Sequence, residues 1–165
     1  MPETVRINFV TGAVRRYVPE IEALRAIPAR VSEAIAGQPM GWLRTPSAEG
    51  EWAPARVIGH VIAYVEQSHE NLYRMAAMTD PVLKLADDAG VASTAGWEHL
   101  PGGSLLERLE AAVASCVELL AELPDASWGR PGLHPTGGRR SIVQQVRLVT
   151  AHCAEHVAQL EGMRR

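Results

Sequence analysis

The stretch Val149-Thr-Ala-His-Cys-Ala-Glu-His-Val-Ala-Gln-Leu160 carries two histidines, His152 and His156, and no glycine or proline that would interrupt a helix. In an α-helix, residues four positions apart lie on the same face, so both imidazoles project to one side. Val149 and Leu160 share that side, which indicates that it faces the core. Two polar rings in such a place need hydrogen-bond partners or a metal ion, because unsatisfied buried polar groups are costly. The stretch predicts a core helix and leaves both explanations of the histidines open.

Two further helices are expected in the first half of the chain. The first runs over residues 12–26, and Pro28 breaks it before further turns over residues 29–36. The second begins near Pro54, because proline suits the first helical position, and continues to about Met78. Its apolar residues recur with the periodicity of an amphipathic helix. The stripe expected to face the core consists of Val57, Val61, Tyr64, Val65, Ser68, Leu72 and Met75.

The third and fourth helices have start signals. Ser104 with Glu107, and Ser141 with Gln144, form the pattern of a capping box, in which each side chain bonds to the backbone of the other residue. Pro124 follows the end of the third helix. The apolar faces of these two helices are expected to consist of Leu106, Leu109, Val113, Cys116, Val117 and Leu120, and of Ile142, Val146, Val149, Cys153, Val157 and Leu160.

The connections between the helices predict their arrangement. Residues 80–103 are rich in glycine, proline and polar residues, with a short helix expected over residues 82–86. Antiparallel neighbours need only a few connecting residues, so this length predicts a crossover that lets the third helix start at the same end as the second. Residues 126–140 are expected to form a loop with a small hairpin. The sequence thus predicts an all-α four-helix bundle with a long crossover between helices 2 and 3, as a single domain over residues 1–165.

Composition argues against several classes of protein. The 165 residues include 16 Lys and Arg against 19 Asp and Glu, with a formal net charge of −3 and no long block of one sign. A nucleic-acid-binding protein would need a concentrated basic surface, and no stretch reaches the ~18–20 apolar residues of a membrane span. The N-terminal segment lacks the plan of a signal peptide, and two cysteines, Cys116 and Cys153, are too few for a disulfide scaffold. We expect a cytoplasmic protein with reduced thiols and no nucleic-acid or membrane partner.

A third histidine can complete a metal site with His152 and His156. Helix bundles build metal sites from facing helices, and a catalytic zinc-type site uses three protein ligands with one position open. His60 lies in the second predicted helix beside its apolar stripe, whereas His69 faces the opposite side of that helix. The remaining two histidines fall in predicted loops. We therefore predict His60, His152 and His156 as metal ligands, with histidines satisfied by hydrogen bonds as the alternative.

Residues beside the pair suggest further roles. The string His152-Cys-Ala-Glu-His156 matches H-x-x-E-H, in which inverted zinc proteases use the glutamate as general base. Too few residues follow His156 to supply that class's downstream ligand, so we reject this assignment. Glu155 stays a candidate for catalytic proton transfer. Gln159, one turn after His156, is either a plain surface residue or one that orients a ligand ring. No other acid or base stands out.

Two motifs resemble those of a known family. Trp52-Ala-Pro-Ala-Arg-Val-Ile-Gly-His60 resembles W-S-x-x-x-V-L-x-H-L, which opens the second helix in the DinB/YfiT-like superfamily. The stretch from His152 to Leu160 resembles that superfamily's closing H-x-x-x-H-x-x-Q-L. The chain departs where Pro54 replaces a capping Ser or Thr, a position that suits proline. The resemblance implies a four-helix bundle in which three histidines, by position His60, His152 and His156, hold a divalent metal.

The resemblance also implies classes of function. Characterised relatives include enzymes that transfer or isomerise with low-molecular-weight thiols such as mycothiol or bacillithiol. We therefore expect a thiol-dependent transferase or isomerase that acts on a small molecule and holds one divalent ion, zinc or nickel first and iron as a further choice. The alternatives are a metal-dependent hydrolase and a non-catalytic bundle that binds a metal or ligand. Because members of the family are often dimers, a homodimer is expected.

Overall fold

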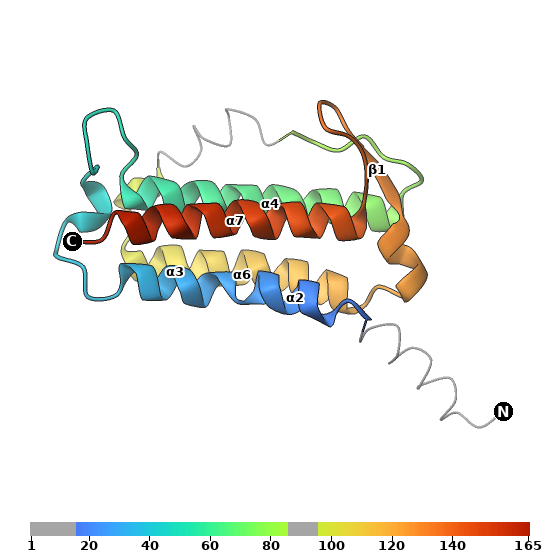
Figure 1. The fold of residues 1–165 in the computed structure, drawn as a ribbon, viewed down its shortest axis with the longest axis horizontal. Coiled ribbons are helices and arrows are strands. Elements are labelled where there is room, and N and C mark those ends of the chain that lie inside the picture. Colours follow the sequence, from blue (N-terminus) through green and yellow to red (C-terminus); the bar gives the residue numbers. More distant parts are fainter. Residues whose placement is uncertain (1–15, 86–95) are drawn as a thin grey trace, which may run out of the picture.

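The computed structural model describes residues 16–85 and 96–165, which fold into a four-helix bundle (Figure 1). In the view of Figure 1, two helices form one layer, and the other layer is made of one unbroken helix and one helix broken into two pieces. The first layer consists of α4 (Pro54–Ala77) and α7 (Ile142–Gly162), and the second of α2 (Val18–Arg25), α3 (Ile27–Ile35) and α6 (Gly102–Ala121). The predicted all-α four-helix bundle is confirmed.

The break in the first helix lies at Ala26, between α2 and α3, with Pro28 in the first turn of the second piece. Proline suits that turn because it has no N–H to donate. The predicted break is confirmed, although the second piece begins at Ile27, before the expected residue 29. The predicted start of the first helix at residue 12 lies outside the described residues.

The helices α4 and α6 start at the same end of the bundle and run in the same direction, whereas α7 runs the opposite way (Figure 1). The chain therefore crosses the length of the bundle between α4 and α6, as its long connection predicts. The short helix expected over residues 82–86 is wrong for the described residues 82–85. There the chain is extended, because Leu83 N donates to Leu133 O and Leu133 N to Pro81 O, each at 2.8 Å.

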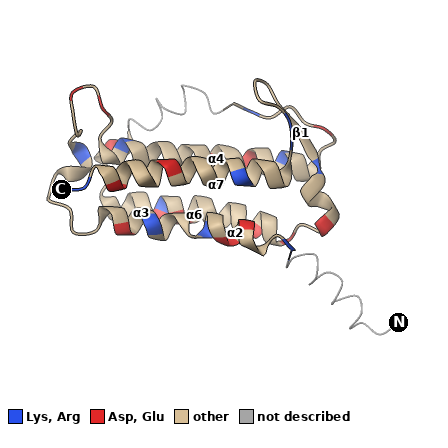
Figure 2. Ribbon diagram, in the orientation of Figure 1, with Lys and Arg blue, Asp and Glu red and all other residues tan. Residues whose placement is uncertain are grey.

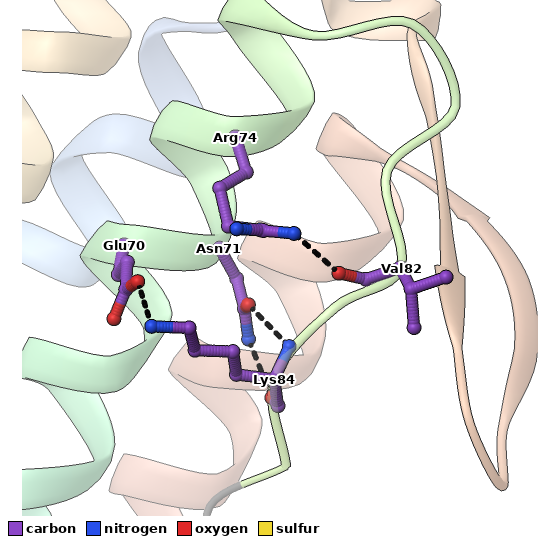
Figure 3. Close-up of polar contacts among 5 residues, drawn as sticks. All are labelled: Glu70, Asn71, Arg74, Val82 and Lys84. Carbon is purple, nitrogen blue, oxygen red and sulfur yellow. Dashed lines mark hydrogen bonds and ion pairs between the residues drawn. The ribbon is translucent and has the colours of Figure 1, made fainter.

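Polar contacts fix the start of this crossover to α4 (Figure 3). Asn71 is 4% exposed, and its side chain makes two hydrogen bonds with the backbone of Lys84, at 2.8 and 2.9 Å. Arg74 Nη2 donates to Val82 O at 3.1 Å, and Lys84 pairs with Glu70. Because a buried amide is costly without partners, Asn71 specifies how the start of the crossover packs against α4.

The predicted apolar stripes form one continuous core. All of the residues expected to face the core on α4, α6 and α7 are buried, apart from Tyr64 and Leu106, which are half-buried at its margin. Trp128, in the short 3-10 helix η3 (Asp125–Gly129), is the largest fully buried side chain and stacks on Tyr17 with ring centroids 4.3 Å apart. The periodicity of apolar residues therefore predicted the packing faces correctly.

The two predicted capping boxes have different outcomes. Ser141 caps α7, with Gln144 N donating to its Oγ and its own N donating to Gln144 Oε1. The prediction of a capping box at Ser104 is wrong, because α6 begins at Gly102 and Pro101 is the residue before it. Leu105 N already donates to Pro101 O at 3.1 Å, so Ser104 lies inside the first turn.

A hairpin precedes α7, as predicted. Its strands are β1 (Pro131–His134) and β2 (Gly138–Ser141), which pair antiparallel. Positive and negative residues are interspersed along the described helices (Figure 2). None of the described helices has both the length and the apolar character needed to cross a membrane.

Candidate metal centre

Three histidines converge between α4 and α7. His60 lies on α4, and His152 and His156 lie one turn apart on α7. The possible ligand atoms of all three lie within 4.8 Å of one another. His60 Nε2 is 3.1 Å from His152 Nε2, and the His156 ring centroid lies 4.8 Å from that of His60 and 4.6 Å from that of His152. The structure thus brings together the three histidines that the sequence predicts as ligands. We call His60, His152 and His156 the histidine triad.

The triad fits a divalent ion. An ion bound to imidazole nitrogens at about 2.0–2.1 Å separates neighbouring nitrogens by about 2.9–3.4 Å in octahedral or tetrahedral geometry. The 3.1 Å between His60 Nε2 and His152 Nε2 falls in this range. Within the described part of the chain, the cluster includes no further His, Cys, Asp or Glu. Three nitrogen donors suit zinc, nickel or iron, and a set of three protein ligands is the kind found in catalytic centres.

Burial and the neighbouring imidazoles lower the pKa of two histidines of the triad, His60 and His152. Burial, followed by the positive charges of His156 and His152, lowers the pKa of His60 from 6.5 to about 4. Burial and then His156 also lower the pKa of His152. A metal ion binds the neutral imidazole, so near neutral pH these residues are already in the form that an ion needs.

Gln159 orients one of the rings. Its Oε1 lies 2.8 Å from His156 Nδ1, and because a carbonyl oxygen only accepts, Nδ1 carries the proton. The lone pair of His156 is then on Nε2. A hydrogen bond of this kind fixes the tautomer and strengthens a metal ligand. Of the two roles that the sequence allowed for Gln159, the structure shows the one that holds a ring in place.

Two aromatic side chains border the triad. The Trp52 ring centroid lies 5.3 Å from that of His60, edge to face, and the Tyr64 ring centroid lies 4.0 Å from that of His152. The sequence placed Tyr64 in the core stripe of α4 and did not connect it with the site. Its position one turn after His60 was the available signal, because residues four apart share a helix face.

The other histidines and Glu155 do not join the cluster. Glu155 is exposed on α7, and a catalytic role for it stays a prediction. His69 is half-buried on α4, and His99 is exposed in the 3-10 helix η2 (Trp97–His99). His134 lies in β1 and accepts hydrogen bonds from the turn that follows, from Thr136 N and Gly137 N.

Both cysteines are buried in the core. Each is 0% exposed, and neither forms a disulfide. Burial raises the pKa of each thiol to about 12, in Cys153 with a smaller contribution from Cys116. Thiols with such a pKa stay protonated and are poor nucleophiles. The predicted place of Cys153 on the apolar, core-facing side of its helix is confirmed.

The lowered pKa values predict that acid destabilises the metal-free protein. Unfolded histidines titrate near 6.5, whereas His60 in the folded protein titrates near 4, so between these values the unfolded chain binds more protons. The free energy of unfolding should therefore fall as the pH drops from about 6.5 to about 4. Because His60 is half-exposed, we expect a loss on the order of 1 kcal/mol. Urea unfolding at several pH values, compared with His60→Ala, measures it; equal pH slopes in both proteins would contradict it.

Comparisons with known proteins identify similar chains. Residues 23–160 match the model of the DinB superfamily. A protein of Geobacillus thermodenitrificans, named as a proposed metal-dependent hydrolase, is 26% identical over 147 residues, which cover 88% of this chain and 82% of the relative.

Solved structures share the fold. YfiT from Bacillus subtilis, described as a probable metal-dependent hydrolase with an unusual four-helix bundle topology, matches with a TM-score of 0.80 at 19% identity, over 90% of this chain and 86% of YfiT. A mycothiol-dependent maleylpyruvate isomerase matches with a TM-score of 0.71 at 15% identity. That match covers 86% of this chain and 59% of the isomerase, so the isomerase has a large part without a counterpart here.

Proposed function

Because the chain belongs to the DinB superfamily, we propose that it is a metal-dependent enzyme whose His60, His152 and His156 bind one divalent cation. The observation that carries the proposal is the convergence of three imidazoles, with no fourth protein ligand among the described residues. A structural zinc site usually has four protein ligands, whereas a catalytic site leaves a position for substrate or water. Zinc or nickel is the ion that we propose first, since imidazole suits both, and iron is a further choice.

The reaction that we propose is transfer or isomerisation of a small molecule with a low-molecular-weight thiol. A divalent ion held by neutral imidazoles keeps its full charge, which lowers the pKa of a thiol or water bound to it. Thiol chemistry of this kind needs no separate general base, and the triad includes no carboxylate. The name of the mycothiol-dependent isomerase with the same fold is consistent with this choice.

The side chains of the site support this chemistry in three ways. Gln159 holds the His156 ring by a hydrogen bond at Nδ1, which leaves the lone pair of Nε2 for an ion. Burial keeps His60 and His152 neutral near neutral pH. Trp52 places an aromatic ring against His60, and Tyr64 places one against His152, so the site offers apolar surface to a substrate beside its ligands.

Hydrolysis is the second proposal. It is favoured by the names of YfiT and of the Geobacillus relative, both described as metal-dependent hydrolases. The two reactions differ in their need for a thiol. Turnover of esters or amides by the metal-loaded protein without added thiol would favour hydrolysis, whereas consumption of a thiol in proportion to product would favour transfer. We also propose that the protein is cytoplasmic and forms a homodimer. Light scattering of the purified protein measures its molar mass and so tests the dimer.

Elemental analysis of the purified, untagged protein tests the metal site. We expect close to one equivalent of metal in the wild type and a near-complete loss in His60→Ala and in His156→Ala. His99→Ala is the matched control, since His99 is exposed and outside the triad. If the wild type takes up no metal even after incubation with zinc or nickel, the metalloenzyme proposal is wrong.

A further inference from the structure

Arg140 places a positive charge where the hairpin meets the first turn of α7. Its Nη1 donates to Oε1 of Gln145 at 3.2 Å, and Gln145 is 4% exposed. On its other side the guanidinium packs on the hairpin turn, where a Cβ added to Gly137 would lie 1.9 Å from Arg140 Nη2. The half-buried guanidinium is thus held between a buried amide and the backbone of the turn.

Among the described residues, Arg140 forms no ion pair with a carboxylate, whereas other arginines nearby do. The adjacent Arg139 pairs with Asp80 at 2.7 Å, and Arg147 pairs with Glu20 at 2.6 Å. Gln145, the side-chain partner of Arg140, is neutral. A guanidinium has five N–H donors and binds carboxylates with two of them in parallel, so Arg140 keeps the capacity to bind an anion.

Arg140 lies on the same side of the α4–α7 pair as the triad. Gln145, which it contacts, lies two helical turns before His152 on the same face of α7. On the facing helix α4, the Tyr64 ring packs on the His152 ring, with the two ring centroids 4.0 Å apart. From Gln145 to His152 the helix rises by about 10 Å.

We infer that Arg140, held by Gln145, binds a carboxylate of the substrate while the reacting group of that substrate lies at the histidine triad. A carboxylate accepts two parallel hydrogen bonds from a guanidinium, and its single charge matches the single charge of Arg140. The inference rests on the proposed function, because it places the carboxylate relative to the metal. It narrows the substrate to small acids in which the carboxylate and the reacting group lie at most about 10 Å apart, because the side chain of Arg140 can reach from Gln145 towards the triad.

Calorimetric titration of the zinc-loaded protein with mercapto-acids of increasing length tests this inference. The probes are mercaptopropionate, mercaptobutyrate and mercaptohexanoate, each beside the mercapto-alcohol of equal length. We expect the wild type to prefer the acid of the best length, and Arg140→Gln to lower the affinity for that acid about 10- to 100-fold, as the loss of a charge-assisted hydrogen-bonded pair predicts. The affinity for the alcohols should not change, which also shows that the variant is folded.

Arg139→Gln is the matched control. Arg139 is the adjacent residue of the same strand, but it is exposed and paired with Asp80, so this variant should bind acids and alcohols as the wild type does. Equal affinity of the wild type for acid and alcohol at every length, or an Arg140→Gln variant that still prefers acids, would overturn the carboxylate assignment and leave the metal site standing. A protein that takes up no zinc would overturn the proposed function and this inference together.

Discussion

Replacing His152 by alanine is expected to weaken zinc binding on the order of a thousandfold or more. The Nε2 atom of His152 lies 3.1 Å from that of His60, and its ring lies 4.6 Å from that of His156, so its loss leaves two ligands of three. Loss of a residue that only orients a ligand costs about 10–100-fold in metal affinity, and loss of a ligand itself should cost more. Competition with a chromophoric chelator measures the affinity.

Two matched variants bracket this effect. Gln159→Ala removes the hydrogen bond to His156 Nδ1 and should weaken binding by about 10–100-fold. His69→Ala removes a half-buried histidine of α4 outside the triad and should leave the affinity unchanged. If His152→Ala binds zinc as tightly as His69→Ala, the ion is held elsewhere and the triad is a cluster of hydrogen-bonded core histidines.

The same variants separate a reactive site from a structural one. A ligand that binds only the folded state stabilises it by about 4 kcal/mol at a thousand times its dissociation constant. Zinc should therefore raise the free energy of unfolding of the wild type and not of His152→Ala. We expect the metal-free wild type to stay folded, because a continuous apolar core lies beneath the triad. Unfolding on removal of the metal would indicate a structural ion.

Much of the fold follows from the sequence, because burial of apolar surface dominates folding and repeats with the helical period. The stripe from Val57 to Met75 and the stripe from Ile142 to Leu160 are buried almost throughout. The long connection after α4 predicted the parallel direction of α6. The histidine triad follows from the same rule, since the faces that bring α4 and α7 together also bring together His60 and the pair on α7.

Features set by contacts between distant segments could not be predicted in this way. The extended path of residues 82–85 depends on a strand bridge to Leu133 and on the buried side chain of Asn71. The early start of α6 depends on Pro101, whose fixed φ permits a helix to begin after it, although Ser104 offers the better local signal. The sequence could not distinguish Arg140 from a solvated surface charge, because its contact with Gln145 depends on how the hairpin turns back onto α7.

Replacing Trp42 by alanine is expected to reduce the free energy of unfolding by about 3–5 kcal/mol, the cost of truncating a large buried side chain. Trp42 is 3% exposed in the 3-10 helix η1 (Trp42–Arg44), and its Nε1 donates to the carbonyl of Met163 at 2.8 Å. Met163 directly follows α7, so the contact fixes the end of the helix that carries His156. Urea unfolding of the metal-free protein measures the loss.

The conservative variant separates the two contributions of Trp42. Trp42→Phe keeps most of the buried surface but leaves the Met163 carbonyl without its donor, which should cost about 1–3 kcal/mol. Because His156 and Gln159 lie in the last two turns of α7, fraying of that end should also weaken zinc binding in Trp42→Ala more than in Trp42→Phe. Equal zinc affinity in both variants and the wild type would show that the triad holds its geometry without the contact at the end of α7, and that the packing of α4 against α7 alone positions it.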